Sequence, residues 1–85
     1  MLVCALIFPH PPFEVEDPWF SLHDRRSVPA PLGLPEAGAP RYMAEIRGRY
    51  GLDRLDAANW AEIRATYYGM VSRVDDHLGR VLRAI

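Results

Sequence analysis

Lysine is absent from this sequence of 85 residues, cysteine occurs once, and proline is missing after Pro40. All ten basic residues are therefore arginines, so the chain has no lysine amine for a Schiff base or for binding a phosphate group. The single cysteine, Cys4, excludes an intrachain disulfide and a zinc site built from cysteines.

Neither sign of charge dominates, because ten arginines and eleven acidic residues leave a net charge of -1. This balance removes the usual electrostatic case for binding nucleic acid or an anionic membrane. A hydrophobic share of 49% is too high for a disordered chain, and the length allows at most one small domain. The apolar run at residues 2–8 is too short for a membrane span and lacks the flanks of a secretory signal.

The first half of the chain predicts a strand followed by a long loop. Residues 2–8 are continuously apolar, which is typical of a strand buried on both faces in a parallel sheet. Residues 9–40 contain all eight prolines, and these disfavour both helix and sheet interior.

The second half, residues 41–85, is predicted to be helical. We expect a short helix near residues 42–50, a break at Gly51, and a long helix from about Ala58 to the end. The long helix could be capped by Asp56 or Asn59. Apolar side chains recur along it every three or four positions, so its large residues are expected to pack in a core rather than form a binding site. These residues are Trp60, Tyr67, Tyr68 and Met70.

Together these elements predict an α/β fold of which the chain is a fragment. A strand buried on both faces needs neighbouring strands, and the sequence offers none. A loop of about thirty residues is uncommon in a compact domain, but it suits the rim of an active site in a large α/β enzyme. The chain is therefore expected to need the rest of a domain in order to fold.

His10 is the candidate for chemistry. It directly follows the apolar run and lies between Pro9 and Pro11, whose fixed φ angles restrict the turn. Ligands bind at the carboxyl ends of parallel strands, where a histidine can donate a hydrogen bond to an anionic oxygen or a leaving group. The alternative is a turn histidine whose ring is satisfied by a nearby carbonyl group.

A second set of candidate residues follows in the loop. His23 and the cluster of Asp24, Arg25 and Arg26 could line a substrate entrance, or could belong to an exposed loop with local charge pairing.

Asp75, Asp76 and His77 look like a metal cluster, but adjacent helical residues point about 100° apart and share no ligand face. A solvated or capping role is expected for them instead of metal binding.

The order and spacing of four blocks resemble the middle of a bacterial sulfatase. The blocks are residues 8–13 (Phe-Pro-His-Pro-Pro-Phe), residues 18–19 (Pro-Trp), residues 28–31 (Val-Pro-Ala-Pro) and residues 63–82, which run from Ile-Arg-Ala-Thr-Tyr-Tyr-Gly-Met to His-Leu-Gly-Arg-Val-Leu. The resemblance spans nearly the whole chain and implies an alkaline-phosphatase-like α/β fold. Residues 1–85 would then be part of a catalytic domain, with strand 2–8, active-site loop 9–40 and helical part 41–85.

The resemblance implies a hydrolase of small anionic sulfate esters, with a formylglycine hydrate as nucleophile and a divalent cation, usually calcium. His10 matches the family's histidine at the end of a central strand, which contacts the sulfate or the bridging ester oxygen. Its implied task is to donate a hydrogen bond where charge accumulates on the leaving oxygen.

Other parts of the family's machinery have no match in the sequence. The family's nucleophile arises from a cysteine in a Cys-x-Pro-Ser-Arg segment, whereas Cys4 lies within the apolar run and is expected to be a small core residue. The family's metal ligands are missing too; they lie in an aspartate pair near the family's N-terminus and in an Asp-His-Gly or Asp-Asn-Gly turn after a later strand. The chain alone is therefore expected to be inactive and to bind no metal.

Two alternatives stay open. A phosphonate monoester or phosphodiester hydrolase of the same fold would resemble the His10 loop and the long helix about as well, since sulfate and phosphate both place three oxygens around a central atom. A free-standing small protein could instead dock its helix on a partner through the apolar stripe. A cytoplasmic location is favoured, while the substrate and the oligomeric state are not readable from the sequence.

Overall fold

The chain forms a small helical structure in the computed structural model, which describes residues 1, 3, 5–33 and 38–85. In chain order the elements are α1 (Trp19–Leu22), α2 (Arg41–Arg49), the 3-10 helix η1 (Leu52–Arg54) and α3 (Ala57–Ala84). No strand occurs in these described ranges, so the predicted α/β fold with a buried strand is wrong. Within the same ranges, no helix is long and apolar enough to cross a membrane.

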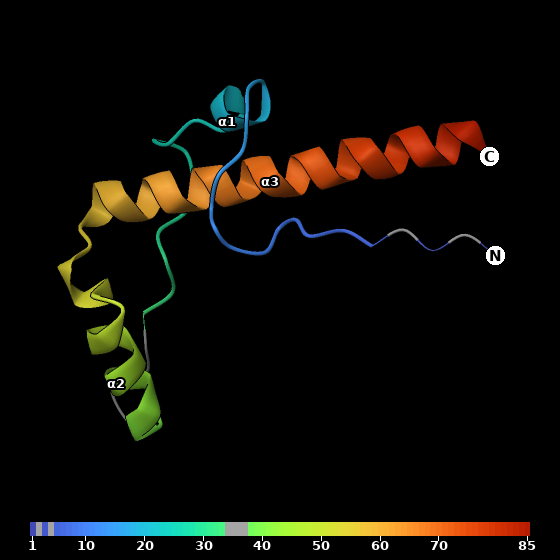
Figure 1. Cartoon of the computed structure of the whole chain (residues 1–85). Coiled ribbons are helices and arrows are strands. Elements are labelled where there is room, and N and C mark those ends of the chain that lie inside the picture. Colours follow the sequence, from blue (N-terminus) through green and yellow to red (C-terminus); the bar gives the residue numbers. More distant parts are fainter. Residues whose placement is uncertain (2, 4, 34–37) are drawn as a thin grey trace.

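Residues 5–8 of the segment predicted to be a strand instead run beside the C-terminal half of α3. Figure 1 shows this segment in blue, following α3 toward the end of the molecule where both termini lie. Leu6 and Ile7 are 49% and 79% exposed, so the apolar side chains are not enclosed between two layers. A strand needs a partner to complete its ladder, and no second strand is available among the described residues. The predicted core position of Cys4 lies outside the described residues.

The Pro-rich loop is interrupted by α1, a helix of one turn that the proline count did not predict. Pro18 stands just before its first residue, where a missing N–H group costs no hydrogen bond. Asp17 accepts hydrogen bonds from both the backbone N–H and the hydroxyl of Ser21, and these bonds hold the turn together.

The two helices predicted in the second half are confirmed. α2 covers the short helix, and Gly51 breaks the chain after it with φ +67°, a left-handed conformation that favours glycine. α3 begins with Asp56 as its N-cap, since the Asn59 N–H donates to Asp56 Oδ1 at 2.7 Å. The Asp56 N–H in turn donates to Asn59 Oδ1 at 3.1 Å, so Asn59 is the partner of the cap and not the cap itself.

The core lies where the N-terminal half of the chain wraps around α3. In Figure 1 the chain passes across α3, forms α1 on the other side and returns behind the helix toward α2. The buried residues of α3 are Ala65, Thr66, Gly69 and Met70, and they lie beneath this crossing. Met70 is fully buried, as predicted for a core residue, but the core around it is small.

Gly69 allows the closest approach between the two halves of the chain. A Cβ atom at this position would lie 2.5 Å from the carbonyl oxygen of Trp19 and 3.2 Å from Val15 Cγ1. The first of these neighbours is backbone and can move only if α1 moves with it. A side chain at position 69 is therefore incompatible with the observed docking of α1 on α3.

Gly69→Ala should destabilise the wrapped structure by about 1–3 kcal/mol, because the added methyl group pushes α1 away from α3. Gly79→Ala is the matched control on the same helix. The nearest atom to its new Cβ is the tip of the Arg83 side chain at 3.3 Å, so the gain in helix propensity of about 0.5–1 kcal/mol should prevail. Urea unfolding followed by circular dichroism measures both changes, and equal stabilisation by the two alanines would contradict the close approach.

Candidate functional site

His10 occupies an exposed turn at the point where the chain leaves the side of α3. Its backbone N–H donates to the Ile7 carbonyl at 2.9 Å, which closes the turn. Its ring nitrogen Nδ1 lies 2.7 Å from the Pro11 carbonyl oxygen. Because a carbonyl only accepts, Nδ1 carries a proton in this contact, and Nε2 is the ring atom left to face solvent.

The ring contact of His10 is the one expected for a turn histidine satisfied by a carbonyl group. It also orients the imidazole, since one nitrogen is fixed and the other is free to bind a ligand. The catalytic assignment of His10 therefore stays a prediction.

His23 and Arg25 attach the returning loop to α3. His23 Nε2 lies 3.0 Å from Ser72 Oγ, and its ring packs edge-on against Tyr68 at a centroid distance of 5.6 Å. Arg25 makes two parallel hydrogen bonds to Glu62, from Nε to Oε2 at 3.0 Å and from Nη2 to Oε1 at 2.9 Å. Such a bidentate pair fixes direction as well as distance.

Local charge pairing, the other prediction for this loop, is confirmed for two of its residues. Arg26 Nη2 donates to Asp24 Oδ2 at 3.1 Å, and the Arg26 side chain is 92% exposed. The hydrogen bonds from Arg26 lower the pKa of the Asp24 carboxyl. Both residues of this pair belong to the loop, so the pair does not attach the loop to α3.

The pKa of Glu62 is lowered, chiefly by its hydrogen bonds from Arg25. The same contact raises the pKa of the Arg25 guanidinium. Thr66 Oγ1, which is nearly buried, donates to Glu62 Oε1 at 3.5 Å. Glu62 is thus held ionised and partnered, which makes it an anchor rather than a general base.

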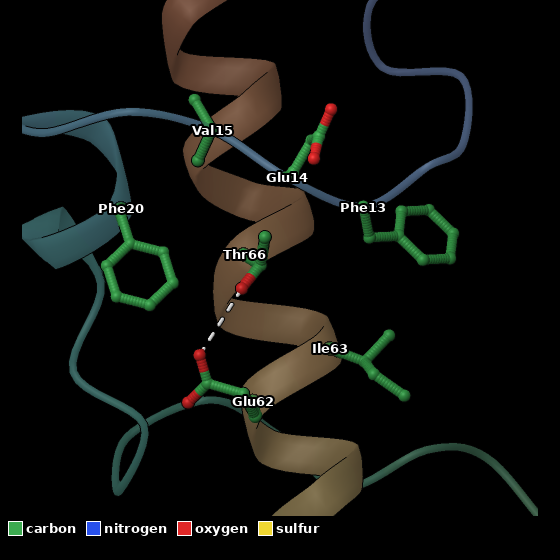
Figure 2. Close-up of a pocket in the computed structure, with 7 residues that line it drawn as sticks. All are labelled: Phe13, Glu14, Val15, Phe20, Glu62, Ile63 and Thr66. Carbon is green, nitrogen blue, oxygen red and sulfur yellow. Dashed lines mark hydrogen bonds between the residues drawn. The ribbon is translucent and has the colours of Figure 1, made fainter.

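A pocket of about 260 Å³ opens beside this anchor, where the chain crosses α3. Figure 2 shows Phe13 and Phe20 on opposite sides of the helix, with Thr66 and Glu62 between them on α3. The walls are mainly aromatic and aliphatic, and His10 is not among the lining residues. The structure therefore does not join this pocket to the predicted catalytic residue.

The large residues of α3 divide between core and surface. Met70 is buried and Trp60 and Tyr68 are half-buried, which agrees with the predicted packing. Tyr67 is 39% exposed and meets Phe13 edge-on, with the ring centroids 6.1 Å apart. Tyr67 therefore holds down the segment that follows His10 instead of filling the core.

The divalent cation implied by the sulfatase resemblance finds no site in the part of the chain that the structure describes. No group of three His, Cys, Asp or Glu side chains there could hold a metal ion. Asp75, Asp76 and His77 follow one another along α3, and His77 faces the N-terminal segment.

Sequence reasoning did not identify Glu62, Ser72 or Arg73 as attachment points of the loop. Their partners lie 37, 49 and 57 residues away in the chain. Helical spacing reveals pairs three or four residues apart, so no local signal was available for these contacts.

A curated protein of Trinickia caryophylli, described as "Multifunctional alkaline phosphatase superfamily protein PehA", is 34% identical to this chain over 88 residues. The similarity supports the alkaline phosphatase superfamily. It does not single out the sulfatase family within that superfamily. The aligned region covers 86% of this chain, but the chain spans only 17% of the length of the superfamily protein it matches. No family profile matches the chain, and no solved structure matches it.

Acid should remove the contribution of the Arg25–Glu62 pair to stability. Because the folded-state pKa of Glu62 is lowered, the pair stabilises the fold above the ordinary value of 4.5, and this stabilisation is lost as the pH falls through the folded-state pKa. Glu62→Gln should cost less than about 1 kcal/mol at neutral pH, since the pair is partly exposed. Urea unfolding of both proteins from pH 7 to about pH 3 should show this difference shrinking toward zero. A difference that stays constant with pH would contradict the role of the Glu62 charge.

Proposed function

We propose that this chain is the His10-bearing part of an alkaline phosphatase superfamily hydrolase that cleaves small anionic esters. The ester would be one of phosphonic, phosphoric or sulfuric acid, in which several oxygens surround the central atom. The observation that carries the proposal is the similarity of 86% of the chain to a protein described as a multifunctional member of that superfamily. A sulfatase is one member of this substrate class, and a phosphonate monoester or phosphodiester hydrolase is another.

His10 would assist departure of the leaving group. The Pro11 carbonyl accepts a hydrogen bond from Nδ1–H, so the imidazole in its doubly protonated form presents Nε2–H to solvent. That N–H can donate to the bridging ester oxygen as negative charge develops there, and it can pass its proton to that oxygen as the ester bond breaks, so that the leaving group departs as the alcohol. The nucleophile, and any cation that the reaction needs, would be supplied by residues outside the part of this chain that the structure describes.

A chimera tests this proposal. The chain would replace the region of the Trinickia caryophylli protein that aligns with it, and release of p-nitrophenol would be followed from p-nitrophenyl phenylphosphonate, bis(p-nitrophenyl) phosphate and p-nitrophenyl sulfate. The chimera should hydrolyse at least one of these esters. His10→Ala should then lower kcat by about 10²–10⁴-fold, the usual contribution of a positioned acid.

Arg83→Ala is the control, because it truncates an exposed side chain near the end of α3 that is part of no described ion pair, and it should leave turnover within about twofold. A loss below about threefold for His10→Ala, with stability unchanged, would exclude the assignment of His10. A folded chimera that turns over none of the three esters would contradict the proposed function and favour the helix-docking alternative.

A further inference from the structure

We infer that Arg73 is a positioning residue for His10, because this one arginine on α3 holds the chain on both sides of the His10 turn. The inference rests on the proposed function of His10 and adds a residue that acts through the turn. Arg73 has no contact with His10 itself among the described hydrogen bonds and ring contacts, so its influence passes through Phe8 and Glu16.

The contact before the turn is with Phe8, two residues ahead of His10. The guanidinium carbon of Arg73 lies 4.4 Å from the centroid of the Phe8 ring. A planar guanidinium over an aromatic face is attracted by the ring quadrupole and also covers apolar surface. Phe8 is half-buried, whereas His10 and its proline neighbours on the C-terminal side are exposed. The N-terminal side of the turn is thus attached to α3 through this stack.

The contact after the turn is with Glu16, six residues beyond His10. Arg73 Nε donates to Glu16 Oε1 at 2.7 Å, and the Arg73 side chain is only 25% exposed. The pKa of Glu16 is lowered by a backbone hydrogen bond and by Arg73, so the carboxylate is ionised near neutral pH. The chain therefore leaves Arg73 at Phe8, forms the His10 turn, and returns to Arg73 at Glu16.

Within the described part of the chain, this is the one ion pair between the His10 turn and α3. Two apolar contacts also lie near the turn, Phe13 against Tyr67 and Val15 near Gly69. Apolar contacts of this kind resist separation but tolerate sliding, because they have no preferred direction. An ion pair at one end and a ring stack at the other fix the turn in both position and register.

The closing experiment uses the same chimera with Arg73→Met, Arg73→Lys and the control Arg80→Met. Arg80 is an exposed arginine on the same helix and is part of no described ion pair. Arg73→Met should lower kcat by about 10–100-fold with KM within about twofold, since a misplaced acid weakens the transition state more than it weakens binding. Arg73→Lys should recover part of the loss, because it retains the charge next to Glu16 but not the planar stack on Phe8. Arg80→Met should match the parent chimera.

Two further measurements separate positioning from general destabilisation. Hydrogen exchange read by mass spectrometry should be faster in peptides covering residues 8–16 for Arg73→Met and unchanged in peptides of α3. On a His10→Ala background, Arg73→Met should cause no further loss of kcat, because its effect passes through His10.

Each outcome assigns the failure to one of the two proposals. A harmless His10→Ala overturns the proposed function of His10, and the role of Arg73 falls with it. If His10→Ala does lower kcat, either of two results overturns the role of Arg73 alone. The first is that the two losses of kcat multiply in the double variant, and the second is that Arg73→Met leaves hydrogen exchange in residues 8–16 unchanged.

Discussion

The close approach of the Trp19 backbone to Gly69 is the constraint on which the rest of this structure depends. It lets a helix of one turn lie against a helix of eight turns without a side chain between them. The chain before α1 and the chain after it pass on different sides of α3 (Figure 1). The buried residues of α3 lie beneath that crossing, so this contact defines the core of the described part of the chain.

A core this small leaves much of the attachment to polar side chains at its edges. Arg25, which follows α1, pairs with Glu62, and Glu16, which precedes α1, pairs with Arg73. Both pairs are partly exposed, so water screens the attraction between their charges and each adds little to stability. Their greater effect is on direction, because a guanidinium bonds a carboxylate only along its N–H vectors. These pairs therefore determine where the loop lies more than how firmly the chain folds.

The function proposed for His10 agrees with a structure in which the core gives stability and the polar pairs set the position of the loop. Its turn lies outside the core, and its exposed ring has one nitrogen held by the Pro11 carbonyl and the other free. An orienting contact on one ring nitrogen is what a histidine needs to present the other to a ligand. The similarity to one part of a much longer superfamily protein agrees with a segment that supplies one oriented side chain to a larger site.

The sequence by itself determined the helices of the second half, because their signals are local. The spacing of apolar residues predicted α3, and Gly51 marked its separation from α2, since a left-handed residue costs glycine little. The apolar run at residues 2–8 predicted a strand, but the sequence offers no second strand with which it could pair. Only the tertiary structure decided that residues 5–8 lie along α3 and that Arg73, among ten arginines, pairs with Glu16. Such a contact forms because the wrapped chain brings two residues together that are far apart in the sequence, and a local sequence pattern cannot predict it.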